Sequence, residues 1–418
     1  MDAQAYRELA AREHEREQAA RKLHWQTTVV LGYNNIPLDV TADGFDVSPI
    51  LGRSCLCATN LERLILGGVK VIVWSPGIGF WKPSGEGLGG RAKVRFIQQQ
   101  YEEVHRLPKL TGGQLQIARN AQDIRRINAE GGVAILLHLS GVSHLNDMAI
   151  LREYYDLGVR MIHCGFQDWP ETGPYDDVVK YGQPGKVVYH GTKLNAHGIR
   201  TIEEMKKLGI IVDVAHLLPE GFDDVVSRLE GLPFVYSHGG VGSLFVNERN
   251  FDDTRIRRVA EHRGVYGIGV CLGPDVRDEA KTGDPENEAK LRLISERRAE
   301  KEKQIAAQAR DIRDYVRQRY TVWDSWEERE LGRLKGYVVK SSMSKTVAHM
   351  KYLREHFGPE VVGYGPDYEC SYQHVLGLEE ADKTPNLTRA LLDAGFTPQE
   401  TQGAMGHNFM RVFETILK

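Results

Sequence analysis

Eight short runs of β-branched and other apolar residues, separated by segments of helical pattern, constrain the fold of this chain more than any other feature. Each run ends in small or polar residues, and several helical segments end in glycine, which lets a helix turn back toward the next strand. Eight strands alternating with helices predict an α/β fold of the (β/α)8 TIM-barrel type. The expected strands span residues 29–35, 69–77, 133–141, 159–166, 210–216, 233–239, 264–272 and 361–367.

A doubly wound open sheet is the alternative arrangement of the same elements. Sheets of that kind bind dinucleotides at a G-x-G-x-x-G turn after the first strand. The residues that follow position 35 lack this pattern. The barrel is therefore the preferred interpretation.

Three segments lie outside a minimal barrel. Residues 1–24 are rich in Ala, Glu, Arg and Gln and are expected to form a helix ahead of a barrel that spans residues 25–418. Residues from about 274 to 335 carry a dense run of both charge signs and predict a helical insertion. One interpretation is that the apolar edge of this insertion packs on the barrel or on a second subunit. The alternative is a solvent-exposed helix that serves only to connect strands seven and eight. Residues 385–418 predict two more helices, with Thr397 as the N-cap of the last. The apolar edge of the insertion consists of Ile305, Ala309, Ile312 and Val316.

The composition excludes several classes of protein. The 418 residues carry a net charge of -3 with a pI near 6.6, so no nucleic-acid partner is expected. Five cysteines are few and odd in number, which is typical of a reducing compartment rather than of a disulfide framework. Residues 1–22 lack the apolar run of a secretory signal, and no stretch reaches roughly 18 apolar residues. The chain is therefore expected to be soluble and cytoplasmic, with no membrane contact.

Polar side chains stand at the ends of the expected strands, where the active sites of such barrels lie. Because side chains alternate along a strand, Tyr33 and Asn35 share one face of the first strand, as His138 and Ser140 do on the third. Two neutral imidazoles and a carboxylate are a ligand set for a divalent metal and its activated water, and strands five, six and eight supply such a set. The candidate residues are Tyr33, Asn34, Asn35, His138, Ser140, His163, His216, His238 and Asp367.

Six further segments occur in a recognisable order. They are residues 60–75 (NLERLILGGVKVIVWS), 151–159 (LREYYDLGV), 204–216 (EMKKLGIIVDVAH), 233–239 (PFVYSHG), 249–253 (RNFDD) and 406–413 (GHNFMRVF). Together they resemble the membrane (renal) dipeptidase family, peptidase M19, of the amidohydrolase superfamily, over nearly the whole chain. The resemblance implies a TIM barrel of the metallo-dependent hydrolase type, with a two-zinc centre that cleaves dipeptides and related amides.

The resemblance also assigns roles to four residues. It implies that His216 and His238 hold a zinc ion and that Asp367 contacts the metal and acts on its water. It implies further that Arg249 binds the carboxylate of the substrate. A guanidinium fork suits that task because it can donate two parallel hydrogen bonds to a carboxylate.

The chain departs from the family pattern where a second zinc would be bound. The family's Gly-His-x-Asp on strand one is GYNN here (residues 32–35), and its bridging glutamate on strand three is Ser140. The family's histidine after strand four, which polarises the substrate carbonyl, falls near Phe166. Neutral hydroxyl and amide groups do not offset the charge of two close zinc ions. One zinc per chain or none is therefore expected, with His138 or His163 as a replacement ligand.

The sequence thus predicts a dipeptidase-like hydrolase that cleaves an amide or related bond in a small substrate bearing a carboxylate. Two alternatives stay open: a metal-free or otherwise diverged enzyme such as a lyase, and a non-catalytic relative that binds a ligand. A homodimer is plausible from the family. The residues expected to contact the substrate are Arg249, Tyr33, Asn35, Ser140 and His163.

Overall fold

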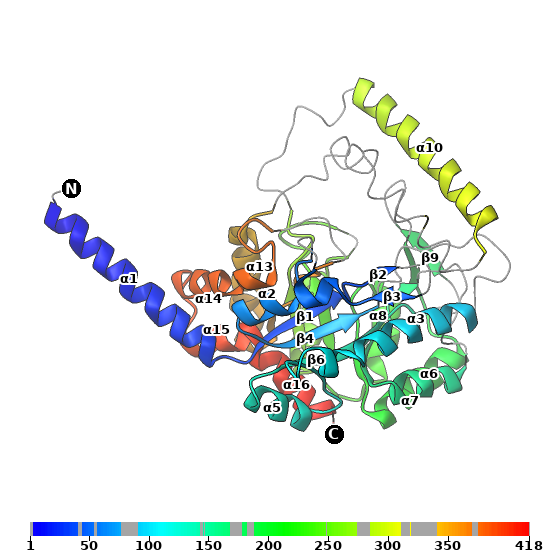
Figure 1. Ribbon diagram of the computed structural model, residues 1–418, viewed down its shortest axis with the longest axis horizontal. Coiled ribbons are helices and arrows are strands. Elements are labelled where there is room, and N and C mark those ends of the chain that lie inside the picture. The colour runs from blue at the N-terminus through cyan, green and yellow to red at the C-terminus, as the bar shows by residue number, and fades with distance from the viewer. Residues whose placement is uncertain are drawn as a thin grey trace.

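Eight parallel strands form a nearly closed barrel with helices on its outside (Figure 1). The structure, a computed structural model, describes residues 3–40, 44–53, 57–76, 91–142, 145, 147–167, 178–181, 188–247, 249–273, 285–310, 318, 341–369 and 375–417. In the order of the sheet, the barrel strands are β1 (Val29–Asn35), β4 (Val69–Ser75), β6 (Val133–Ser140), β7 (Val159–His163), β11 (Ile211–Asp213), β12 (Val235–Gly239), β13 (Val265–Ile268) and β14 (Val362–Tyr364). The predicted barrel is confirmed, and the open sheet was the wrong alternative.

The barrel closes where the segment after β14 meets β1. Tyr368 forms a parallel bridge with Asn34. The Asp367 amide donates to the Tyr33 carbonyl at 3.1 Å, and the Asn35 amide donates to the Tyr368 carbonyl at 2.9 Å. The last strand-end residues are thereby held against the first strand.

Side-chain caps start many of the helices between the strands. Asn60, Asn120, Asp147, Asn195 and Asp252 each accept a hydrogen bond from a backbone amide in the first turn. The helices that follow these caps are α2 (Leu61–Leu66), α5 (Ala121–Ala129), α6 (Met148–Asp156), α7 (Ala196–Leu208) and α9 (Asp253–Glu261). The remaining helices around the barrel are α3 (Arg91–Val104), α4 (Leu107–Leu110), α8 (Pro219–Ser227), α13 (Met343–Phe357), α14 (Thr384–Asp393), α15 (Pro398–Gln402) and α16 (Asn408–Ile416).

Several short strands and helical turns lie outside the eight barrel strands. A two-stranded sheet pairs β2 (Asp39–Val40) with β3 (Phe45–Asp46), and β5 (Leu115–Ile117) lies beside the start of β6. A separate three-stranded sheet contains β8 (Phe166–Gln167), β10 (Val188–Gly191) and β9 (Val178–Tyr181). Single helical turns span Pro49–Arg53, Pro359–Val361, Ala381–Lys383 and Gly403–His407.

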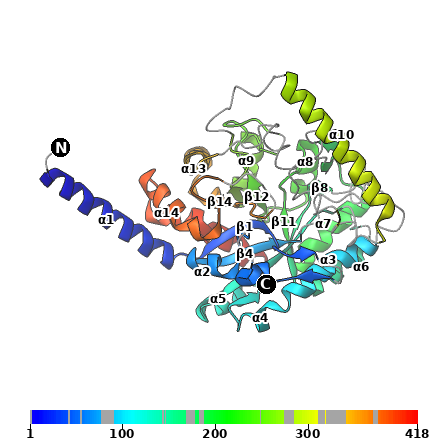
Figure 2. The same ribbon diagram turned by 45° about the horizontal axis from the view of Figure 1, so that its top comes forward.

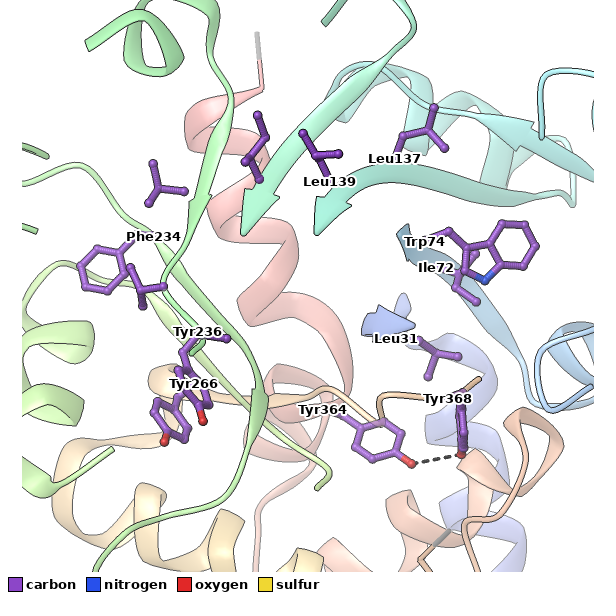
Figure 3. Close-up of a cluster of buried hydrophobic side chains, with 14 of the residues drawn as sticks. Leu31, Ile72, Trp74, Leu137, Leu139, Phe234, Tyr236, Tyr266, Tyr364 and Tyr368 are labelled. Carbon is purple, nitrogen blue, oxygen red and sulfur yellow. Dashed lines mark hydrogen bonds between the residues drawn. The ribbon is translucent and has the colours of Figure 1, made fainter. Parts of the chain in front are cut away.

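Buried apolar side chains form two clusters, as the alternation along a strand requires. The inner cluster holds Val71 and Val73 of β4 together with Phe409 of α16. The Phe409 ring lies so close to Gly32 of β1 that a Cβ at this position would collide with its Cζ atom. Helix α16 therefore closes the N-terminal end of the barrel, and the site is left to the opposite end. The outer cluster, drawn in Figure 3, includes Leu31, Ile72, Trp74, Leu137 and Leu139.

Two long helices extend from the barrel at opposite edges of the molecule, α1 (Ala3–Gln26) and α10 (Pro285–Gln308) (Figures 1 and 2). His24 anchors the end of helix α1, because its Nε2 atom forms a hydrogen bond of 2.8 Å with the Gly67 carbonyl. Near the end of α10, Ile305 and Ala309 pack against the outer cluster. The other two members of the predicted apolar edge, residues 312 and 316, lie outside the described residues. The domain boundaries themselves stay a prediction.

The cap predicted at Thr397 is confirmed, but the helix that it starts, α15, is not the last one: it ends at Gln402, and α16 follows after a turn with non-helical backbone at Gly406. Thr397 Oγ1 accepts from the Glu400 amide at 3.2 Å, and the Thr397 amide donates to Glu400 Oε2 at 2.7 Å. None of the helices in the described part of the chain has both the length and the apolar character needed to cross a bilayer.

Candidate active site at the C-terminal ends of the strands

The predicted strand-end residues come together at the open end of the barrel. The Tyr33 ring stacks on His238 with 4.0 Å between ring centroids, and its centroid lies 5.0 Å from that of His138. The rings of His163 and His216 are 4.9 Å apart. The buried residues of this group are Tyr33, Asn34, Asn35, His138, Ser140, His163, His216, His238 and Asp367.

An extra residue in β1 aims Tyr33 into the barrel. Leu31 pairs with Ile72 and Asn34 with Trp74, so three steps along β1 match two along β4. This bulge shifts the alternation by one residue, so that Tyr33 and Asn35 both face the interior and their side chains lie 3.5 Å apart. Asn34 instead bonds backbone groups of the barrel wall. Its amide lies 3.4 Å from the Val73 carbonyl and its oxygen accepts from the Tyr368 amide at 3.3 Å.

His216 and His238 present their Nε2 atoms to each other at 3.3 Å. Two ligands of one tetrahedral zinc, each about 2.05 Å from the metal, are separated by about 3.3 Å. Ser237 Oγ lies 2.8 Å from His238 Nδ1. When that nitrogen donates to Ser237, Nε2 carries the lone pair that a metal requires. Burial, followed by the nearby Arg249 guanidinium, holds the pKa of His238 well below its ordinary value, so the imidazole is neutral.

Asp367 and Arg249 form an ion pair next to the two histidines. The Asp367 carboxylate is almost fully buried, and its Oδ2 lies 3.6 Å from Arg249 Nη2. Asp367 and His216 both have left-handed backbone, with φ values of 58° and 64°. Such conformations are costly for non-glycine residues and gather at functional sites. Both residues lie beyond their strands, since β11 ends at Asp213 and β14 at Tyr364, short of the predicted residues 216 and 367.

Asp213 is a site residue that the sequence analysis missed. Its Oδ2 lies 3.1 Å from His138 Nε2, and its Oδ1 accepts from the amides of Ala215 at 3.0 Å and Ser237 at 3.1 Å. Burial alone would raise its pKa, but the His163 and His138 imidazoles and these hydrogen bonds hold the pKa below the ordinary value. The signal was present in the sequence, since Asp213 is a lone acid in an apolar run, three residues before His216.

His163 bonds the Ala215 carbonyl through its Nε2. Burial is the main reason that the pKa of His163 falls to about 4, so this imidazole is neutral near pH 7. With Nε2 engaged by the barrel wall, its roles as a substrate contact and as a replacement metal ligand stay predictions. Phe166, where the family carries a further histidine, begins β8 outside the barrel.

The residues fit one zinc better than two. The pair of Nε2 atoms matches two positions of a single tetrahedral site. On β1 and β6, where the family's second zinc ligands would stand, the chain carries Tyr33, whose ring stacks on His238, and the neutral side chains of Asn35 and Ser140, which do not fit a second dication. Within the described residues, no three His, Cys, Asp or Glu side chains lie close enough together to hold a metal ion. The roles of Asp367 and His138 as further ligands therefore stay predictions.

Buried polar groups fix the loop that carries Arg249. The Tyr236 hydroxyl donates to the Arg249 carbonyl at 2.7 Å, and the Tyr266 hydroxyl donates to the Gly240 carbonyl at 2.7 Å. The two tyrosine rings stack at 4.0 Å, and Figure 3 shows them side by side. Asn250 accepts from the Gly240 amide and donates to the Cys271 carbonyl, both at 2.8 Å. The backbone of Arg249 is thus held from two neighbouring strands, while its side chain reaches Asp367.

His349 of α13 anchors the same loop and makes stability depend on pH. Its Nδ1 accepts from the Val241 amide at 2.9 Å, and its Nε2 lies 3.2 Å from the Leu272 carbonyl. Burial is the main cause that lowers its pKa from 6.5 to about 4. As the pH falls, His349 is therefore protonated in the unfolded chain before it is protonated in the folded protein. The stability that the neutral side chain contributes above pH 6.5 is lost as the pH falls toward 4.

We expect His349 to account for roughly 2 kcal/mol of lost stability between pH 7 and pH 4.5. The His349→Asn variant keeps an acceptor for the Val241 amide, but its side chain cannot take a proton. Between pH 7 and pH 4.5, the free energy of unfolding of this variant should therefore fall less than that of the wild-type protein. Urea denaturation of both proteins at the two pH values measures the difference. Equal losses of stability would show that another group is responsible.

Comparisons with known proteins place the chain in a family. It is 24% identical over 362 residues to dipeptidase tcpJ from Claviceps purpurea, covering 85% of this chain and 69% of that one. The probable dipeptidase PvdM from Pseudomonas aeruginosa has a similar fold, with a TM-score of 0.70 at 18% identity over 97% of this chain and 99% of that chain.

A metallopeptidase from Rhodobacter sphaeroides, solved with a phosphinate mimic of the dipeptide L-Ala-D-Ala, is also similar. Its TM-score is 0.62 at 18% identity, with coverage of 93% of this chain and 99% of that chain. The sequence profile of the membrane dipeptidases matches residues 17–418. The chain therefore belongs to the membrane dipeptidase family, peptidase family M19.

Proposed function

We propose that this member of the family hydrolyses an amide or related bond in a small substrate bearing a carboxylate, with one metal ion at most. The observation that carries the proposal is the pair of converging Nε2 atoms of His216 and His238 beside the ion pair of Asp367 and Arg249. A zinc ion held by these two histidines would lower the pKa of a bound water to about 7 and polarise the scissile carbonyl.

The protein's own groups have distinct tasks in this reaction. The Asp367 carboxylate accepts the proton of the attacking water and returns it to the leaving nitrogen. Arg249 orients the substrate through its carboxylate, and its ion pair with Asp367 holds both side chains in register.

A metal-free enzyme is the second candidate, and one observation favours it. Asp367 already contacts Arg249, and the described residues bring no third ligand to the histidine pair. In this case Asp367 and a neutral histidine would exchange protons with the substrate directly, as in a lyase. A ligand-binding relative without activity has the same pocket residues but no turnover.

Metal analysis and an amide panel separate these candidates. Protein purified without chelators should contain about one zinc per chain and release amino acid from small amides with a free carboxylate. Turnover that persists after complete removal of zinc would support the metal-free enzyme. No turnover with or without zinc would leave only the ligand-binding relative.

Replacing Arg249 with lysine tests the substrate class. We expect kcat/KM for carboxylate-bearing amides to fall about 10- to 100-fold, mostly through KM, because an ammonium group cannot form the two parallel hydrogen bonds of the guanidinium fork. Arg152→Lys, on an exposed helix surface, is the matched control. An unchanged KM for Arg249→Lys would remove the carboxylate from the proposed substrate.

Cytoplasmic location and a homodimer also remain proposals that rest on composition and on the family. Light scattering of the purified chain measures its oligomeric state directly.

A further inference from the structure

The ends of β1, β4 and β6 form a neutral half of the site that the proposed reaction leaves without a task. The last residues of these strands are Asn35, Ser75 and Ser140, and all three side chains are buried. None of them carries a charge. The opposite half, at the ends of β12 and β14, carries His238 and Asp367.

Ser75 is the clearest sign that this half binds something. It pairs in register with Asn35 of the neighbouring strand, and the alternation that places Val71 and Val73 in the inner cluster turns Ser75 to the same interior. Its Oγ atom is fully buried and has no hydrogen-bond partner among the described residues. Leaving a buried hydroxyl without a partner is unfavourable, so such an atom indicates a bound water or ligand group.

His138 offers a second such atom on the next strand. Its Nε2 donates to the Asp213 carboxylate, which leaves the lone pair on Nδ1. Nδ1 is also buried without a hydrogen-bond partner in the described part of the chain. Two groups on adjacent strands are therefore available to a ligand. The Ser75 hydroxyl can donate or accept a hydrogen bond, and His138 Nδ1 can accept one.

The acids of the described site are already paired. Asp213 accepts hydrogen bonds from His138 and from the Ala215 and Ser237 amides, and Asp367 forms an ion pair with Arg249. Among the residues that the structure describes, an ammonium group in the neutral half would meet no carboxylate that is not already engaged, and burying an unpaired charge is strongly unfavourable. A hydroxyl or amide group would instead satisfy the two open atoms.

We propose that Ser75 and His138 form a subsite for an uncharged hydrogen-bonding group on the acyl side of the substrate. The preferred substrates are then amino acids acylated by a neutral group, rather than dipeptides with a free ammonium group. This inference rests on the proposed function, in which Arg249 binds the carboxylate at the other end of the amide.

Two isosteric amides test the subsite. Glycyl-alanine and glycoloyl-alanine differ only in carrying an ammonium group or a hydroxyl at the same position, and both are assayed with L- and D-alanine. We expect kcat/KM to be at least about tenfold higher for the glycoloyl amide, since a site built for a hydrogen bond discriminates strongly against a mismatched group.

Substitutions at Ser75 connect this preference to the subsite. Ser75→Ala should lower the glycoloyl preference about three- to tenfold, and Ser75→Asp should shift it toward the glycyl amide by supplying a carboxylate. Ser227→Ala, on the exposed face of α8, should leave it unchanged. If the Ser75→Asp variant does not fold, the Ser75→Ala variant is sufficient for the test. An unchanged preference for the glycoloyl amide in Ser75→Ala would contradict the proposal.

The outcomes separate the inference from the function on which it rests. Cleavage of both amides with a preference for the glycyl compound overturns the subsite and keeps the hydrolase. Cleavage of neither amide overturns the hydrolase, and calorimetric binding of the two compounds then tests the subsite. Equal or tighter binding of the glycyl amide would overturn it.

Discussion

His216→Ala is expected to remove the bound metal and almost all amide hydrolysis. The wild-type protein should contain about one zinc per chain, and the variant less than about a tenth of that, because one imidazole cannot hold the ion alone. Hydrolysis should fall by at least about 10³-fold, since the activated water is lost with the metal. Elemental analysis and initial rates on the same preparation measure both effects.

Two further variants make this result interpretable. His216 has left-handed backbone, which asparagine tolerates better than alanine, so His216→Asn guards against a purely conformational effect. His356→Ala changes an exposed histidine of α13 and should alter neither zinc nor rate. Full activity in a metal-depleted His216→Ala protein would contradict the one-metal hydrolase and favour the metal-free reading.

Asp367→Asn is expected to lower kcat about 10²- to 10⁴-fold with little change in KM. The amide keeps the size of the side chain and suits the left-handed backbone at φ 58°, but it cannot accept the proton of the attacking water. The variant also removes the ion pair between residue 367 and Arg249. Steady-state kinetics with zinc determined on the same sample measures the loss.

Asp393→Asn, at the exposed end of α14, is the matched control and should be fully active. Metal-loaded Asp367→Asn protein that retained wild-type kcat would show that another group is the base. Asp213 would then be the next acid to test, because it lies in the same interior and already bonds a histidine.

The barrel could be predicted because the signals for it are local. A run of apolar residues and a helical pattern are each readable within about ten positions, and local side-chain caps at Asn60, Asn120 and Asn195 mark where helices start. The strand ends were predicted less accurately, since β11 and β14 end three residues before His216 and Asp367, which take left-handed backbone. That conformation depends on packing at the barrel mouth and has no local signal in these residues.

The composition of the site could be read only in part. The polar residues at the strand ends were found because parallel strands bring their carboxyl ends to one edge. Asp213, a single acid within an apolar run, and Ser75, at the end of one, were missed because neither belongs to a motif of its own. Which partners these side chains meet depends on the register of the neighbouring strands, as the pairing of Asn35 with Ser75 shows.

The sequence by itself determined the alternation of strands and helices, the family, and the loss of the acidic and imidazole groups from strand one and of the acid from strand three. These are properties of residue types in order, and hydrophobic periodicity expresses them directly. Only the tertiary structure decided that a bulge turns Tyr33 onto His238, that two imidazole nitrogens converge at 3.3 Å, and that Arg249 reaches Asp367 from a distant loop. Those distances arise from closure of the barrel, which joins strands far apart in the chain.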